Sequence, residues 1–147
     1  MRYSVLALTV CALLGASAGL AQSAASHTVA VSIPVVLRLS LDGTVGQTQV
    51  MPLQVEVAAG GYQITPRASR LLLFANSSWQ LSASFQGDPA LTWQLDGRGG
   101  RLRSYPQVLA GGGATGGWRP LIVTYGLAQL PADGRYQGLV IYTLTRP

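Results

Sequence analysis

Few side chains in this 147-residue chain could carry chemistry, and the acidic ones come first. A pair of carboxylates can hydrolyse a glycoside by acid–base catalysis. Four of the five acids stand in turn sequences beside glycine or proline, where aspartate is favoured: Asp42, Asp88, Asp96 and Asp133. Glu56 alone lies in an alternating, strand-like segment, on the side opposite the apolar residues. We therefore expect Glu56 to be solvated and no carboxylate pair to be catalytic.

The remaining reactive residue types are equally sparse. His27 is the single histidine and Cys11 the single cysteine, so neither has a neighbour of the kind that a metal site or a nucleophilic triad needs. The chain has no lysine, which excludes a P-loop and a Schiff base. Gly111, Gly113 and Gly116 match a dinucleotide-loop spacing, but no strand leads in and no helix follows. We expect a protein that is not an enzyme and that uses no cofactor or metal.

Arginine supplies all ten basic residues, and the net charge is +5 at pH 7. Most arginines are scattered, and we expect no nucleic-acid partner. One stretch mixes arginine with aromatic residues that could stack on sugars or hold an anionic polymer. This possible ligand surface comprises Arg98, Arg101, Arg103, Tyr105, Trp118 and Arg119. The alternative is a solvated hairpin tip with core aromatic residues behind it, and Trp79 and Trp93, which share the parity of apolar neighbours, are assigned to the core.

The start of the chain has the layout of a secretory signal peptide. Residues 1–21 have a short basic start, an apolar stretch and then small residues that offer cleavage sites. We expect export to the periplasm or cell surface, with membrane contact only through this segment during export. Residues 22–147 then form one domain, which lacks cysteine and so depends on packing and strand pairing for its stability.

The elements that position these residues are strands. Apolar side chains occupy every odd position from Thr28 to Leu41, which predicts a strand with one buried face. Pro34 cannot donate to a ladder, so this strand lies at a sheet edge or contains a bulge. An edge strand of this kind can pair with another chain. Its possible partner-strand residues are Val29, Val31, Ile33, Leu37 and Leu39.

Further alternating or apolar segments follow along the chain. Residues 51–57 and 62–64 predict strands, 71–74 predict a strand buried on both faces, and 79–95 predict a hairpin. Glycine-rich residues 97–117 predict a long flexible loop with at most one short strand, before strands return at 121–125 and 136–144. The nearly all-apolar run 139–142 predicts a central strand. We expect an all-β, immunoglobulin-like antiparallel sandwich of seven to nine strands after the signal peptide.

The closing segment 134–145, with its glycines, Tyr136, Tyr142 and the sequence Tyr-Thr-Leu-Thr, resembles the final strand of pilin-like and WxL-like bacterial envelope domains. The alternating segment behind the signal peptide is similar to the donor strand of chaperone-assembled pilins, which completes the sheet of a neighbouring subunit. The chain differs from many such pilins because the exported part has no cysteine, and it lacks the WxL tripeptide. The resemblance implies a surface β-sandwich.

These patterns favour an exported bacterial envelope protein with a structural or interaction role, whose partner is an envelope protein, a surface polymer or a second copy. A pilin-like polymerising subunit would hold residues 28–41 outside its own fold or pair them between chains. A carbohydrate-binding module would expose Trp118 and Tyr105 on one concave face. A hydrolase, the remaining alternative, would place Glu56 beside a second carboxylate in a cleft.

Overall fold

A computed structural model describes residues 28–147. The predicted signal peptide, Cys11 and His27 lie outside the described residues. The chain divides into two units at the bond between Ile33 and Pro34. Residues 28–36 have no strand or helix assignment, and every regular element follows them. The described residues include no helix of the length and hydrophobicity that crossing a membrane requires.

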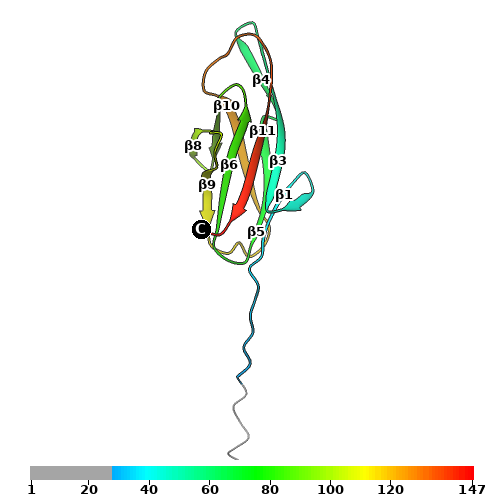
Figure 1. The fold of residues 1–147 in the computed structure, drawn as a ribbon, viewed down its shortest axis with the longest axis vertical. Coiled ribbons are helices and arrows are strands. Elements are labelled where there is room, and N and C mark those ends of the chain that lie inside the picture. The colour runs from blue at the N-terminus through cyan, green and yellow to red at the C-terminus, as the bar shows by residue number, and fades with distance from the viewer. Residues whose placement is uncertain (1–27) are drawn as a thin grey trace, which may run out of the picture. The chain divides into compact units, whose positions relative to one another are not determined.

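The second unit is all-β, with eleven antiparallel strands in two sheets. One sheet has six strands in the order β2-β1-β5-β10-β7-β8, and the other has five in the order β4-β3-β11-β6-β9. Figure 1 shows β3, β11 and β6 side by side, with β5 and β10 in the layer behind them. The strands are β1 (Leu37–Leu41), β2 (Thr44–Gly46), β3 (Thr48–Ala58), β4 (Gly61–Thr65), β5 (Ala68–Ala75), β6 (Trp79–Gly87), β7 (Leu91–Leu95), β8 (Arg98–Arg101), β9 (Gln107–Gly112), β10 (Arg119–Leu127) and β11 (Gly134–Thr145).

Alternation along the strands builds one core between the two sheets. In β3 the odd residues are buried and the even residues exposed over all eleven positions. Successive side chains of a strand point to opposite faces, so one face of each sheet meets the other sheet and the second face meets solvent. The core includes Trp79 and Trp93, as the sequence predicted. The last strand, β11, lies between β3 and β6 and is central, which confirms that expectation.

The predicted long first strand is only half correct. Strand β1 covers Leu37–Leu41, where Leu37, Leu39 and Leu41 are buried and paired with β5. Residues 28–36 belong to no strand, although they continue the same alternation. The alternating apolar side chains are therefore buried within the fold only at Leu37–Leu41, where β5 pairs with the chain.

The predicted hairpin over residues 79–95 is wrong. Strand β6 pairs with β11 and β9 in one sheet, whereas β7 pairs with β10 and β8 in the other. The chain crosses between sheets at Gly87, whose φ of 142° only glycine adopts freely. A Cβ there would lie 2.6 Å from the Gln137 carbonyl oxygen. Both strands still direct their apolar faces into the same core, so alternation could not distinguish the two arrangements.

The glycine-rich segment 97–117 contains two strands, β8 and β9, in place of a continuous loop. Leu102 and Leu109 are buried from this segment, and β9 extends the five-stranded sheet beyond β6. These strands and short β2 raise the number of strands above the seven to nine predicted. In β5, Leu71 and Leu73 are buried but Leu72 and Phe74 only partly so, which corrects the expectation of burial on both faces.

Candidate interaction surfaces

The segment Thr28–Val35, which we call the arm, exposes its apolar side chains. Val29 and Val31 are each 79% exposed and Ile33 is 77% exposed. The corresponding odd residues of β1 are at most 7% exposed. Of the predicted partner-strand residues, the structure therefore places Leu37 and Leu39 in the protein's own core and leaves Val29, Val31 and Ile33 on the arm.

Asn76 holds the chain where the arm meets the sheet. Its side-chain oxygen accepts a hydrogen bond of 2.7 Å from the Val36 amide, and its Nδ2 donates to the Pro34 carbonyl at 2.8 Å. The Asn76 amide also donates to the Val36 carbonyl at 3.2 Å. The side chain imitates a strand backbone across Pro34, which has no amide hydrogen to donate.

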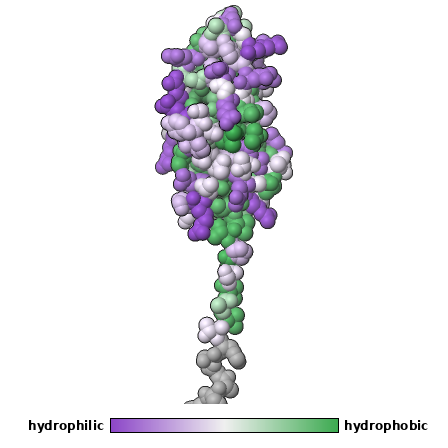
Figure 2. Space-filling model, viewed as in Figure 1, coloured by the Kyte–Doolittle hydropathy of each residue, from purple (hydrophilic) through white to green (hydrophobic). Residues whose placement is uncertain are grey.

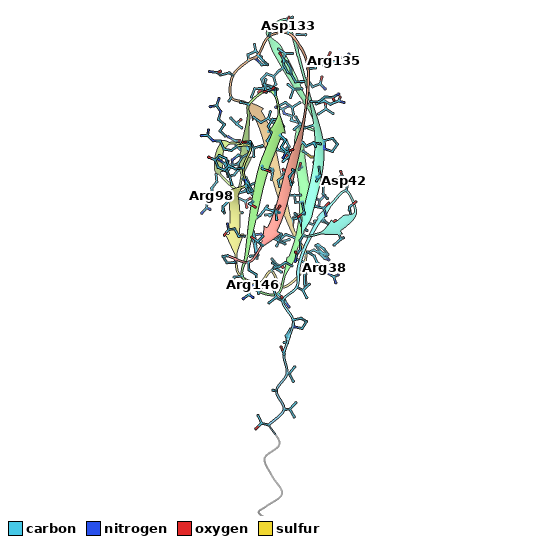
Figure 3. All side chains as sticks on the ribbon, in the orientation of Figure 1. Arg38, Asp42, Arg98, Asp133, Arg135 and Arg146 are labelled. Carbon is cyan, nitrogen blue, oxygen red and sulfur yellow. The ribbon has the colours of Figure 1, made fainter. Side chains whose placement is uncertain are left out.

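The predicted arginine and aromatic surface is divided between separate places. Arg119 lies 3.9 Å from Asp96 in an exposed ion pair, while Trp118 contacts Phe74 with ring centroids 5.9 Å apart. Figure 3 labels Arg98 at the side of the domain where Figure 1 shows β8 and β9. Exposed Tyr105 belongs to none of these contacts.

Arg101 and Arg103 do share one concave surface. They border an open cavity of about 420 Å³ together with Gln107 and Val108, and the cavity floor includes Trp93 and Gly100. A side chain at position 100 would lie 3.2 Å from the indole nitrogen of Trp93, so glycine leaves part of that ring uncovered. These two arginines are one part of the predicted ligand surface that the structure keeps together; Arg98 and Arg119 line a different cavity.

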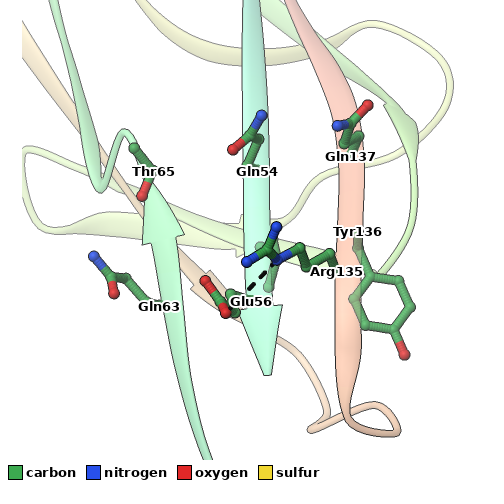
Figure 4. A pocket seen from close by; sticks show the side chains of 8 residues that line it. Gln54, Glu56, Gln63, Thr65, Arg135, Tyr136 and Gln137 are labelled. Atoms are coloured by element: carbon green, nitrogen blue, oxygen red, sulfur yellow. Dashed lines mark ion pairs between the residues drawn. The ribbon is translucent and has the colours of Figure 1, made fainter. Parts of the chain in front are cut away.

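Glu56 lies on the outer face of the five-stranded sheet, in a polar cleft of about 310 Å³. Figure 4 shows Glu56 facing Arg135, whose Nε lies 3.7 Å from the carboxylate, with Gln54, Gln63 and Gln137 around them. No other acidic residue lines this cleft within the described residues. The arrangement does not provide the two carboxylates that glycoside hydrolysis needs.

The same outer face carries an apolar patch. Val50 and Leu139 are 53% and 40% exposed, and strand register places Val50 opposite Ile141 and Leu139 opposite Pro52. Figure 2 shows hydrophobic residues gathered over β3 and β11 on this face. Pro52 and Leu139 also border an open hollow of about 330 Å³ on this face.

A second opening lies between the sheets, beside the first half of β10. This cavity of about 260 Å³ is lined by residues of both layers: Trp79, Leu95, Asp96, Arg98, Leu109, Ala110, Gly111, Arg119 and Leu121. Trp79 is 2% exposed, and its Nε1 has no hydrogen-bond partner among the described residues. Gly112 has no side chain to cover this nitrogen; a Cβ there would lie 3.4 Å from it. Sequence reasoning assigned Trp79 to the core and placed Arg98 and Arg119, which also line this opening, in the predicted ligand surface.

Buried polar side chains connect the strands inside the core. Ser69 is hydrogen-bonded to Tyr125 at 2.6 Å, and Tyr125 is hydrogen-bonded to Tyr142 across the two sheets. Burial raises the pKa of both tyrosines above the ordinary value. Gln49 donates to the carbonyls of Leu39 and Thr44, which fastens the β1–β2 turn. Sequence reasoning did not single out these polar residues. The available signal was that they occupy positions which, in the alternating pattern of their strands, fall on the buried face.

No group of three or more histidine, cysteine or acidic side chains lies close enough to hold a metal within residues 28–147. Comparisons with protein-family models, with curated proteins and with solved structures found no match to this chain.

Proposed function

We propose that this is an exported, non-enzymatic protein of the bacterial envelope, with a structural or interaction role exercised by strand addition through the arm. One observation carries the proposal: the apolar alternation of β1 continues into the arm, where Val29, Val31 and Ile33 are 77–79% exposed and Val35 is 45% exposed. Scattered exposed apolar residues are normal, but four of them at a period of two give an extended segment one apolar face. The immunoglobulin-like form of the sandwich belongs to the same proposal, supported by two antiparallel sheets whose chain crosses between layers.

The energetics favour an arm that is ordered only when it is bound. Fixing eight residues costs about 1 to 2 kcal/mol each in backbone entropy. Burying a valine or isoleucine returns about 1.5 to 3 kcal/mol, so four such side chains offset much of that cost but not all. Ladder hydrogen bonds of about 0.5 to 1.5 kcal/mol each supply the remainder. Asn76 lowers the cost because it already orders the chain at Pro34 and Val36.

A polymerising, pilin-like role is the form of this proposal that the exposed arm favours. A carbohydrate-binding role has weaker support, because Trp118 packs at a tilt against Phe74 and neither Trp118 nor Tyr105 lines the cavity of Arg101 and Arg103. The cavity bordered by Arg101 and Arg103 would be its site.

The mass of the protein in solution tests the proposal. Light scattering after size-exclusion chromatography would compare the purified exported protein with a Val31→Ser/Ile33→Ser variant over a hundredfold range of concentration. We expect the unchanged protein to assemble as concentration rises and the variant to remain a monomer with the same free energy of unfolding. An Ala30→Ser/Ser32→Ala variant changes the other side of the arm and serves as the matched control. Equal masses for the protein and the Val31→Ser/Ile33→Ser variant would overturn the proposal.

A further inference from the structure

We infer that the arm of one copy is received by the cavity beside β10 of a second copy. This inference rests on the proposed function and specifies its binding site. Three features lie at this cavity: an unpaired strand edge, an opening between the two sheets, and Trp79, whose buried Nε1 has no acceptor among the described residues.

The unpaired edge belongs to Arg119–Val123 of β10. Strand β7 pairs with β10 only from Thr124 onward, while β5 pairs with β10 on the other side from Arg119. The Ala128 amide donates to the Ala90 carbonyl, so even-numbered residues of β10 direct their backbone groups toward the β7 side. Ile122 therefore presents a free amide and a free carbonyl, and Pro120 presents a carbonyl. An incoming strand could form hydrogen bonds with these unpaired backbone groups.

The cavity supplies apolar contacts on the inward-facing side of β10, where every second side chain of an added strand would also lie. Leu121 faces inward from β10, and Leu109 and Leu95 line the same space. A strand paired with Ile122 alternates in step with β10, so its inward side chains stand beside Leu121. If the odd arm residues enter, the even residues Ala30 and Ser32 take the positions opposite Ile122. Both have the amide hydrogen that such a position uses, whereas Pro34 does not.

Trp79 contributes a polar group to the cavity wall. Its Nε1 is a buried donor without an acceptor among the described residues, and a strand brings carbonyl acceptors at regular spacing along its edge. Because this nitrogen is closed off from solvent in the unbound protein, pairing with an incoming carbonyl requires the side chains around Trp79 to move. The arm carries no charged residue, so it can enter without desolvating a charge past Asp96, Arg98 and Arg119 at the rim.

The reach of the chain favours a second copy over the protein's own arm. Asn76 fixes Pro34 and Val36 next to β1, and β5 and β10 both separate β1 from the open edge. Strands lie about 4.8 Å apart, so crossing three strand spacings takes about 14 Å. At about 3.5 Å per residue the crossing uses about four residues before pairing begins. Ile33 and Val31 would then lie in the crossing segment and could not enter the cavity.

One other free edge provides a comparison. The Thr48–Leu53 part of β3 has no partner on the β4 side, since β4 pairs only from Gln54 onward. Its ladder position at Pro52 lacks an amide hydrogen, as Pro120 does on β10, but the opening beside it is lined by β3 and β11 of one sheet and does not lie between the two layers. The edge of β3 therefore serves as the matched control in the test.

Disulfide trapping between two singly substituted proteins tests the inference. Each protein also carries Cys11→Ser, so the introduced cysteine is the only one. One protein carries Ala30→Cys, and the second carries Ile122→Cys or, as the control, Val50→Cys. Residues directly opposite in a ladder have Cα atoms about 5.5 Å apart, which suits a disulfide. We expect mixtures with Ile122→Cys to form at least tenfold more heterodimer than mixtures with Val50→Cys, and Val31→Cys, which would face the cavity, to be a poor substitute for Ala30→Cys.

The outcomes separate the inference from the proposal on which it rests. Assembly measured by light scattering, with trapping at Val50→Cys in preference to Ile122→Cys, would overturn the cavity as the receiving site and leave strand addition intact. Absence of assembly would overturn both. A chain carrying both Ala30→Cys and Ile122→Cys that forms only an intramolecular disulfide at low concentration would show that the arm fills its own cavity, contrary to the inference.

Discussion

The arm and β1 carry one continuous apolar alternation, yet the structure buries the second and exposes the first. Leu39 in β1 is fully buried between paired strands, whereas Val31, eight residues earlier, is 79% exposed. The two segments do not differ in pattern; they differ in whether a strand edge is available beside them. An alternating pattern indicates that a segment can bury one of its faces. Whether that face is buried depends on a neighbouring strand with which the segment can pair.

Replacing one apolar residue in each segment should separate the two roles most strongly. Leu39→Ala removes a fully buried side chain and is expected to lower the free energy of unfolding by about 2 to 5 kcal/mol. Val31→Ala is expected to change it by less than about 0.5 kcal/mol. Urea unfolding of both variants measures the contrast. A loss of more than about 1 kcal/mol for Val31→Ala, measured on the monomer, would mean that the arm already belongs to the protein's own core.

The buried tyrosines should make the core, but not the arm, sensitive to alkaline pH. Their pKa values are raised in the folded protein, and unfolded tyrosine ionises near pH 10. Above about pH 10 the unfolded state binds fewer protons than the folded state, so stability is complete below that pH and falls as pH rises. The expected slope is up to about 1.4 kcal/mol per pH unit for each tyrosine.

Tyr142→Phe tests this assignment. We expect a loss of about 1 to 3 kcal/mol at neutral pH, because Tyr125 keeps only Ser69 as a partner, and a smaller slope above pH 10. Urea unfolding at pH 7, 9 and 10.5 gives both quantities. Tyr62→Phe, which changes an exposed tyrosine, is the control. An unchanged slope for Tyr142→Phe would contradict the assignment.

The junction between the two segments should show an intermediate effect. Asn76→Ala removes both side-chain hydrogen bonds to Pro34 and Val36, and we expect a loss of about 0.5 to 1.5 kcal/mol with faster amide exchange at Val36. Asn76→Asp keeps the acceptor for the Val36 amide and loses only the donor, so its effect should be smaller. Equal exchange at Val36 in all three proteins would show that Asn76 does not order the junction.

The apolar patch on the outer sheet face should give the smallest effect. Leu139→Ser alters a side chain that is 40% exposed, and we expect less than about 0.5 kcal/mol change in stability and no change in assembly. Light scattering on this variant, beside Val31→Ser, compares the two exposed apolar surfaces directly. Loss of assembly with Leu139→Ser alone would move the interaction from the arm to the sheet face.

Strand β3 was predictable because its period of two is long and strict, and β11 because its run at residues 139–142 is nearly all apolar. The pairing of β6 and β7 was not, because strands in opposite layers and strands in one hairpin bury the same residues. The prediction allowed one short strand in the glycine-rich segment and not the two that form, β8 and β9, because the glycines there weaken the pattern. The cavity at Trp79 depends on where β7 stops beside β10, a property of register that no local pattern contains.

Hydrogen–deuterium exchange of the arm against protein concentration tests most directly whether the arm is a strand that pairs only between molecules. The account predicts fast exchange for residues 28–35 in dilute protein and protection in concentrated protein, with the amides of β1 protected in both. Fast exchange of the arm at every concentration, or protection that persists on dilution to the monomer, would contradict it.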